Sequence, residues 1–444
     1  MRLQSVNKIL FVAALIALIV WTYSCKVTQP AVDPNDVSYI YNPVNKPINH
    51  RYSVFNDLGN KSILSVKLYS ADVLFSEANV TGEPLASFTI TVRLFNDTQG
   101  GVLTDTAKLA VEINKKNVGS EFVIPIELIA YDGFEYTAEL RVIENTTRRM
   151  TQSFVKFDRA SPYSSNFYRA RHHSFNDELF SNVLIKDEFI NLQYPSGQYD
   201  TLYVLYYKYF DLIPYAPSMM LPERSIDRDP AMIIPVAWSD TLPIMFPGKG
   251  IYLCTVDSNI RQGYTFFNFG EEYPELTTPE TMIEPLAYIA TQDEMSTMRS
   301  NPKPKLALDE FWLARSSNIE RSRELLRIYF KRVLFANFYF TSYKEGWRTD
   351  RGMIYIIYGP PDKIYKNSEG ERWGYKKPVV KSKWGSGYSV EEEYLWFLFT
   401  NKKNPFTTND YYLSRSDATP TFWEQAVASW RKGVAYSVAS PDDI

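Results

Sequence analysis

The sequence has few of the residues that build metal centres and disulfide frameworks. Its 444 residues include only two cysteines and three histidines, His50, His172 and His173. None of these histidines has a second ligand at helical or strand spacing, and Cys254 has no thiol neighbour. We therefore expect neither a zinc site nor any other cofactor.

An excess of charge of one sign is also lacking. The formal net charge is −3 at pH 7, and no run of five like charges occurs. This balance gives no electrostatic reason to expect nucleic acid as a partner. The chain is 45% hydrophobic and long enough for two to four globular domains. Its 32 tyrosines and 27 phenylalanines favour β-rich packing, because aromatic side chains fit pleated surfaces.

The first 25 residues differ from the rest of the chain. Arg2 and Lys8 form a short basic region, and residues 9–20 are a continuous apolar run. The run is too short for a convincing membrane-spanning helix and is typical of a secretory signal. Because it ends at Ser24 and Cys25, residues 1–24 resemble a lipoprotein signal peptide, although bulky residues at 21–23 depart from the usual pattern.

This resemblance implies cleavage before Cys25 and acylation of its thiol and of the new N-terminus. Acyl chains would hold the protein on a membrane, since each buried methylene contributes about 0.8 kcal/mol. Cys254 would then have no disulfide partner and is expected to be a buried small hydrophobic residue. An uncleaved anchor, or ordinary secretion with an incidental cysteine, is the alternative. Residues 25–50, which contain four prolines, predict a tether.

Two β-rich regions follow the tether. In residues 51–158, apolar and polar residues alternate with a period of two, as in 87–94 and 135–142. We expect an antiparallel sandwich of immunoglobulin-like size there. Residues 159–278 predict a second β-sandwich, with strands near 202–210, 250–256 and 264–269 and a proline-rich connection over 214–247.

From residue 279 to 444 the pattern indicates an α+β domain. Ser317 or Asn318 is placed to cap a helix that runs to about Phe340, with apolar side chains at helical spacing. Another buried strand is expected over 394–399 and a short helix over 421–430. The charged face of the long helix is interpreted as solvated, and a partner-docking face is the alternative.

Glycine, proline and tryptophan are concentrated in residues 346–362, GWRTDRGMIYIIYGPPD. Gly346 is expected near the end of the long helix at positive φ, and Trp347 in the corner behind it. Thr349 and Asp350 suit a tight turn. The apolar run 353–358 predicts a buried strand that ends where the prolines begin.

This segment resembles the GWxTD domain of lipoproteins and secreted proteins from Bacteroidetes-type bacteria. The resemblance covers about residues 285–399, and further matches within this region are residues 309–312 and 329–337. The resemblance implies that the protein is a lipoprotein or a secreted protein, and it does not imply any particular reaction. The residues that carry the motif, to which we assign a mainly structural role, are Gly346, Trp347, Thr349, Asp350, Arg351, Gly352, Gly359, Pro360, Pro361, Asp362, Glu371, Trp373 and Tyr375.

The leading functional hypothesis is a non-enzymatic outer-membrane lipoprotein that acts as a binding or assembly module for an envelope protein complex. One alternative is a glycan-binding lipoprotein that uses aromatic platforms. A second is an envelope hydrolase that uses a carboxylate pair of the motif. The platforms would be Trp347, Trp373, Trp384 and Tyr388, and the hydrolase residues would be Asp350, Arg351, Asp362 and Glu371.

The orientation on the membrane is predicted from the residues after Cys25. Surface-exported lipoproteins of these bacteria tend to carry acidic residues soon after the lipidated cysteine. Here residues 26–29 contain none, and the first acidic residue is Asp33. The sequence therefore favours a periplasm-facing protein, with surface exposure as the alternative.

The anchoring hypothesis is tested with Cys25→Ala. This variant lacks the acylated thiol, so we expect it to move from the membrane fraction to a soluble or precursor form. Fractionation of cells and labelling with a radioactive fatty acid measure both effects. Unchanged membrane association, together with no lipid label on the wild type, would contradict the lipoprotein interpretation.

Overall fold

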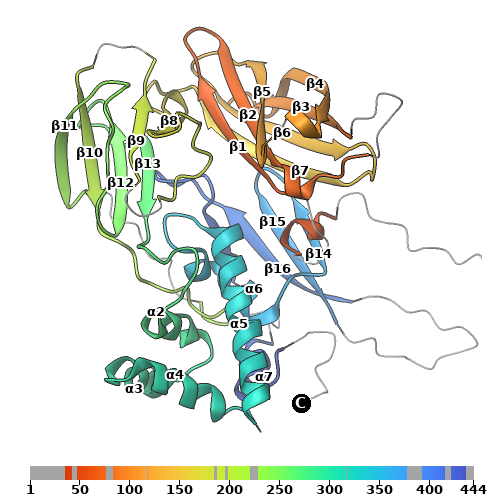
Figure 1. Ribbon diagram of the computed structural model, residues 1–444, viewed down its shortest axis with the longest axis vertical. Helices are drawn as coiled ribbons and strands as arrows, with labels where there is room; N and C mark the ends of the chain where they lie inside the picture. The colour runs from red at the N-terminus through yellow and green to blue at the C-terminus, as the bar shows by residue number, and fades with distance from the viewer. Residues whose placement is uncertain are drawn as a thin grey trace, which may run out of the picture. The chain divides into compact units, whose positions relative to one another are not determined.

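The computed structural model describes residues 36–42, 48–76, 84–117, 119–184, 188–195, 199–220, 229–316, 318–377, 393–415 and 422–436 (Figure 1). The predicted signal peptide, Cys25 and most of the predicted tether lie outside these residues. The chain divides into two units, Met1–Asp36 and Val37–Ile444. All the helices and strands among the described residues lie in the second unit.

Residues 50–158 form two facing antiparallel sheets. One has the order β1-β2-β5 and the other the order β4-β3-β6-β7. Burial alternates along β3 as the sequence predicts, and Leu64, Phe88 and Leu140 meet in one core between the sheets. The strands are β1 (His50–Asn56), β2 (Lys61–Tyr69), β3 (Leu85–Asn96), β4 (Val102–Asn114), β5 (Glu121–Ile129), β6 (Glu135–Glu144) and β7 (Met150–Asp158).

Two side chains close one end of this sandwich. The hydroxyl of Tyr136, at the start of β6, accepts a hydrogen bond from the amide of Tyr131 at 2.9 Å and donates one to its carbonyl. The buried guanidinium of Arg159 donates to the carbonyl of Lys61 at 2.7 Å and lies 2.6 Å from a carboxylate oxygen of Asp132. Both contacts tie the chain after β5 and β7 to neighbouring loops.

The second β-rich region is a four-stranded antiparallel sheet of order β11-β10-β12-β13, with a two-stranded sheet beside it. One face of the larger sheet packs on a core around Leu192 and Trp238. Its other face, with Leu205 and Ile251, packs against Phe406 of the C-terminal part rather than against another sheet. The strands are β8 (Arg169–His172), β9 (Ile190–Gln193), β10 (Thr201–Tyr207), β11 (Met232–Ala237), β12 (Gly250–Thr255) and β13 (Tyr264–Asn268).

The C-terminal part is built around the long helix α5, which lies in the middle of Figure 1. Asn318 caps α5 as predicted, because its side chain accepts a hydrogen bond from the amide of Arg321 at 2.8 Å. The helices are α2 (Pro279–Ile283), α3 (Gln292–Ser300), α4 (Pro304–Leu313), α5 (Ile319–Phe340), α6 (Asp350–Tyr358) and α7 (Trp423–Arg431). Short 3-10 turns are η1 (Ser38–Tyr41), η2 (Ser70–Asp72), η3 (Lys115–Asn117), η4 (Ser165–Phe167), η5 (Glu284–Tyr288) and η6 (Gly346–Arg348).

A four-stranded antiparallel sheet of order β14-β15-β16-β17 completes this part. Its strands are β14 (Lys363–Lys366), β15 (Gly370–Lys376), β16 (Tyr394–Asn401) and β17 (Tyr411–Leu413). Aromatic rings fill the space between the sheet and α5. Trp373 of β15 lies 5.3 Å from Phe340 of α5 and 4.7 Å from Phe399 of β16, between ring centroids. The predicted strand near 394–399 is confirmed.

The prediction of a strand over 353–358 is wrong. These residues belong to α6, and every residue of this helix is buried. A short apolar run buried on all sides carries no period, so a strand and a core helix look alike in the sequence. Thr349 decides the local structure: its side chain accepts a hydrogen bond from the amide of Gly352 at 3.0 Å, which is the geometry of a helix N-cap.

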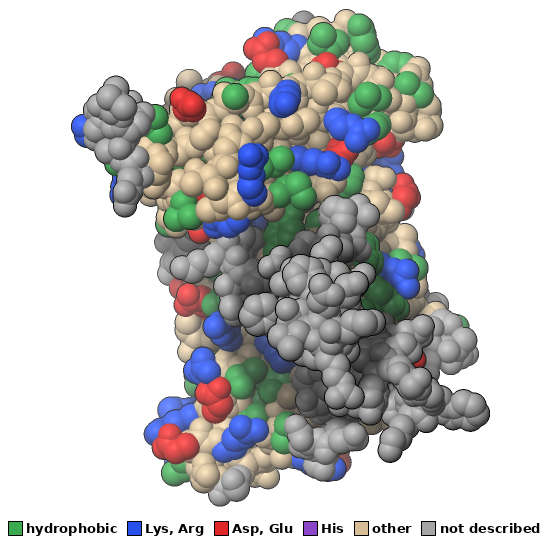
Figure 2. Space-filling model, turned by 90° about the vertical axis from the view of Figure 1, so that its right-hand side faces the viewer, with side chains coloured by type: hydrophobic (Ala, Val, Ile, Leu, Met, Phe, Trp, Pro, Cys, Tyr) green, Lys and Arg blue, Asp and Glu red, His purple; other side chains and the backbone are tan. Residues whose placement is uncertain are grey.

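The outer surface carries both charges. On the face drawn in Figure 2, basic and acidic side chains are interspersed rather than gathered into separate patches. None of the helices among the described residues is long and apolar enough to cross a membrane.

Candidate functional site

The motif begins with a close contact between η6 and α5. A Cβ atom added to Gly346 would lie 2.0 Å from the carbonyl oxygen of Ala336. Gly346 is not among the positive-φ glycines, so the expected C-cap conformation is wrong. The glycine is required because two backbones touch there. Gly352 extends the contact, since its own added Cβ would lie 2.0 Å from the carbonyl oxygen of Gly346.

Trp347 is held by its backbone as well as by its ring. Its amide donates to the side-chain oxygen of Asn337 at 3.0 Å, and its carbonyl accepts from the hydroxyl of Tyr288 at 2.7 Å. The ring is 1% exposed and lies between α5 and the start of α6. The expected corner position is therefore correct, although the corner joins two helices rather than a helix and a strand.

Asp350 joins α6 to the last strand of the sheet. One carboxylate oxygen lies 2.6 Å from Arg415, and the other accepts from the amide of Leu413 at 2.9 Å. Thr349, the preceding residue, makes the turn bond, because its hydroxyl donates to the carbonyl of Gly346 at 2.7 Å. Asp350 thus serves as a buried ion-pair partner rather than the turn residue that the sequence suggests.

Arg351 and Glu371 form the centre of a buried cluster. Arg351 of α6 lies 3.2 Å from Glu371 of β15, and its other terminal nitrogen donates to Asn409 at 2.6 Å. Lys366 of β14 lies 3.1 Å from the same Glu371 oxygen. The second Glu371 oxygen accepts from the indole of Trp373 at 3.0 Å. Each charge is therefore paired, as a buried charge requires.

The N-terminal segment, residues 37–41, completes this cluster. The hydroxyl of Tyr41 donates to Glu371 at 2.8 Å, and the hydroxyl of Tyr355 donates to the carbonyl of Tyr41 at 3.0 Å. The amide of Val37 donates to the carbonyl of Ile364 in β14 at 2.9 Å. In Figure 1 this orange-red segment lies beside β14, far in sequence from everything that it touches.

The end of the motif is placed apart from the cluster. Gly359 ends α6 at φ 87°, a conformation that favours glycine, and its carbonyl accepts from Tyr375 at 2.9 Å. Pro360 and Asp362 are exposed, whereas Pro361 is buried. Asp362 accepts from the amide of Lys376 at 2.7 Å and so pairs β14 with β15. Among the four residues considered for a hydrolase, only Arg351 and Glu371 touch.

Comparison with known proteins agrees with the motif. Residues 250–432 match the family model of the GWxTD domain. The protein contains a GWxTD domain. The matched region begins at β12, well before residue 279, so it includes strands that the sequence analysis assigns to the second sandwich. Those strands also share a core with Tyr343 and Phe406.

Other comparisons add little. No curated protein matches the chain. Among solved structures, a beta-glucuronidase of Bacteroides uniformis is 12% identical, over 26% of this chain and 15% of that one, with a TM-score of 0.17. Beta-glucuronidase 2 of the same organism, bound to cyclophellitol-6-carboxylate aziridine, is 13% identical over the same shares, with a TM-score of 0.16. The chain spans about 15% of either protein's length, and TM-scores this low do not establish a shared fold.

The electrostatics of the GWxTD domain favour a permanently ionised cluster. Burial raises the pKa of Glu371, but Lys366, Arg351 and the Tyr41 hydroxyl outweigh it and hold the pKa at about 2. A carboxylate with so low a pKa is a weak proton acceptor near neutral pH. Among the described residues, no three His, Cys, Asp or Glu side chains are grouped to hold a metal ion. Cys254 is buried, and burial raises the pKa of its thiol.

Two aromatic residues considered as glycan platforms do not reach the surface. Trp347 is 1% exposed and Trp373 is fully buried, so neither face is available for stacking. The other two platform residues, Trp384 and Tyr388, lie outside the described residues. Sequence reasoning missed Tyr41, Lys366 and Asn409. No motif marks them, and Tyr41 is 330 positions from its carboxylate partner.

The contact at Gly346 predicts a large loss of stability in Gly346→Ala. The new methyl group would collide with the backbone of α5, so we expect the free energy of unfolding to fall by about 2 kcal/mol or more. Gly119→Ala is the matched control, because an added Cβ there meets no atom within 4 Å and φ is not positive. Its effect should stay within about 0.5 kcal/mol. Equal effects of the two changes in urea unfolding would contradict this assignment.

The low pKa of Glu371 predicts that the free energy of unfolding depends on pH in the acidic range. The pKa of Glu371 in the folded protein, about 2, lies below its ordinary value of 4.5. The stabilisation that comes from the ionised carboxylate is therefore complete above pH 4.5 and is lost as the pH falls towards 2. Glu371→Gln should lose about 3–5 kcal/mol at pH 7, because Arg351 and Lys366 stay buried without their carboxylate. Its unfolding should also become less sensitive to pH between 4.5 and 2. Asp362→Asn, which alters an exposed carboxylate of the same domain and leaves an oxygen to accept from Lys376, should change neither quantity.

Proposed function

We propose that this protein is a non-enzymatic lipoprotein of the outer membrane, anchored through Cys25 and facing the periplasm. Its GWxTD domain holds the chain that follows the anchor, and its β-rich parts bind a partner in an envelope protein complex. The buried ion pairs of Asp350, Arg351 and Glu371 support a structural role for the motif. We therefore assign the binding function to the surface of the protein.

The observation that carries the proposal is the docking of residues 37–41 into the GWxTD domain. Cys25 lies twelve residues before Val37, a distance that an extended chain spans in about 40 Å at most. An anchor at Cys25 therefore places the GWxTD domain, and not the first sandwich, next in line after the membrane. The prolines of residues 25–50 predict the opposite order, because one continuous tether would lead directly to the first sandwich.

The first sandwich supports an immunoglobulin-like spacer. Its seven strands form two facing sheets, although β4 lies beside β3 rather than beside β5 as in the seven-stranded immunoglobulin domain. The Tyr136 hydroxyl bonds back to Tyr131 as in a tyrosine corner. We interpret residues 51–158 as this spacer and residues 159–278 as the second one. In the latter, the GWxTD domain itself takes the place of a facing sheet.

The partner surface that we propose lies on β11. This strand is at the edge of its sheet, and Met232, Ile233 and Ile234 are 55%, 42% and 38% exposed. Met219 and Met220 are exposed as well. Apolar side chains at a sheet edge are unfavourable in water unless another chain covers them. The flexible methionines suit such a contact because they adapt to the shape of a partner.

Co-purification after mild detergent extraction tests this function. We expect the wild type to retain a membrane protein in stoichiometric amount and Ile233→Glu to lose it, since the new charge would be buried at the contact. Leu58→Glu is the control, because Leu58 is 67% exposed on the first sandwich. Retention of the partner by Ile233→Glu would remove β11 from the proposal. A monomeric wild type would overturn the assembly function.

A further inference from the structure

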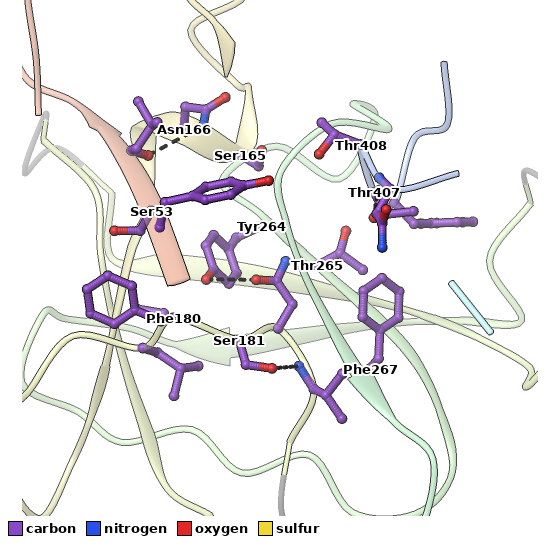
Figure 3. Close-up of a pocket in the computed structure, with 18 of the residues that line it drawn as sticks. Ser53, Ser165, Asn166, Phe180, Ser181, Tyr264, Thr265, Phe267, Thr407 and Thr408 are labelled. Carbon is purple, nitrogen blue, oxygen red and sulfur yellow. Dashed lines mark hydrogen bonds between the residues drawn. The ribbon is translucent and has the colours of Figure 1, made fainter. Parts of the chain in front are cut away.

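A polar cleft lies where the first sandwich, the second β-rich region and the GWxTD domain meet. Its volume is about 350 Å³, within the range of small-molecule sites. The walls come from β1 and β7, from residues 165–183, from β13, and from two segments of the GWxTD domain, 338–342 and 404–409. Figure 3 shows Ser53 on one side of the cleft and Thr407 and Thr408 on the other, with Tyr264 between them.

The charges that line the cleft are mostly positive. The lining includes three basic side chains, Arg51, Lys156 and Arg169, and one acidic side chain, Glu178. Glu178 is already used, because it lies 2.7 Å from Arg169 and also accepts from the hydroxyl of Ser53. Arg51 and Lys156 form no ion pair with any residue that the structure describes: Arg51 lies over the ring of Phe338, and Lys156 donates to Asn401 at 3.4 Å. The cleft therefore favours an anion.

The neutral part of the lining contains hydroxyl and amide side chains beside apolar ones. Hydroxyl and amide groups both donate and accept hydrogen bonds, as the hydroxyl groups of a sugar do. Ser342 is the most informative, because it is 1% exposed and its hydroxyl has no hydrogen-bond partner among the described residues. The Nε atom of Arg169 is buried and unpartnered in the same way. Buried polar groups without partners are costly, so both side chains would gain hydrogen bonds from a small rotation towards a ligand bound in the cleft.

We propose that this cleft binds an acidic saccharide, with Arg51 and Lys156 facing its carboxylate or other anionic group. Ser342 and the hydroxyl groups of the opposite wall bind its ring hydroxyls. An acidic peptide fits less well, because the ring faces of Phe180 and Phe338 are already covered by Lys67 and Arg51. The site is independent of membrane anchoring and of the contact at β11.

Calorimetric titration of the full mature chain in detergent tests the site. The probes are a trimer of galacturonic acid and the uncharged trimer of galactose. We expect the acidic trimer to bind at least about tenfold more tightly, a difference of 1.4 kcal/mol. The preference should shrink as the salt concentration rises, because salt screens exposed charges. Equal binding of the two probes, or binding of neither, would overturn the proposal.

Variants of the lining localise the binding. Lys156→Ala and Ser342→Ala should each weaken binding of the acidic trimer by about tenfold or more. Lys108→Ala removes an exposed lysine from β4 of the same sandwich, away from the cleft, and should leave it unchanged. Thermal unfolding of each variant shows whether the fold is intact. An effect of Lys108→Ala equal to that of Lys156→Ala, or tight binding of a glutamate-rich peptide in place of the saccharide, would refute the assignment.

Discussion

The carboxylate of Glu371 joins segments of the GWxTD domain that lie far apart in the sequence. It contacts Tyr41 at the start of the described chain, Lys366 in the neighbouring strand, and Arg351 in α6. It is 1% exposed, so these contacts cannot be replaced by water. Because desolvation makes each partner depend on the others, the N-terminal segment, the helix and the sheet keep their positions together. The rest of the GWxTD domain is arranged around this requirement.

The backbone contact at Gly346 sets the second constraint. It brings η6 against α5, and Thr349 then starts α6 in the direction that takes Arg351 to Glu371. A side chain at Gly346 would push α6 outward and pull the guanidinium away from its carboxylate. The letters of the motif therefore have different physical roles: glycine allows close approach, tryptophan fills the corner, threonine caps a helix, and aspartate anchors a strand.

Burial of the motif directs function to the surface. Two surface features differ in chemistry. One is the exposed apolar edge of β11, and the other is the polar cleft where the first sandwich, the second β-rich region and the GWxTD domain meet. The first suits a protein, since it offers apolar area and flexible methionines. The second suits a small anionic ligand with many hydroxyl groups. The GWxTD domain contacts both of its neighbours: Tyr343 and Phe406 pack on the larger sheet of the second β-rich region, and its main core holds the N-terminal segment.

Elements with a local period or a local cap can be predicted from the sequence. The strands of the first sandwich and the long helix capped by Asn318 follow from alternation, helical spacing and one side chain. Packing with distant residues makes residues 353–358 a helix, since burial on every side removes the period. It also decided why Gly346 is a glycine and which residue meets Glu371. Tyr41 and Glu371 are 330 positions apart, and no local pattern records a contact that exists only after both have left water.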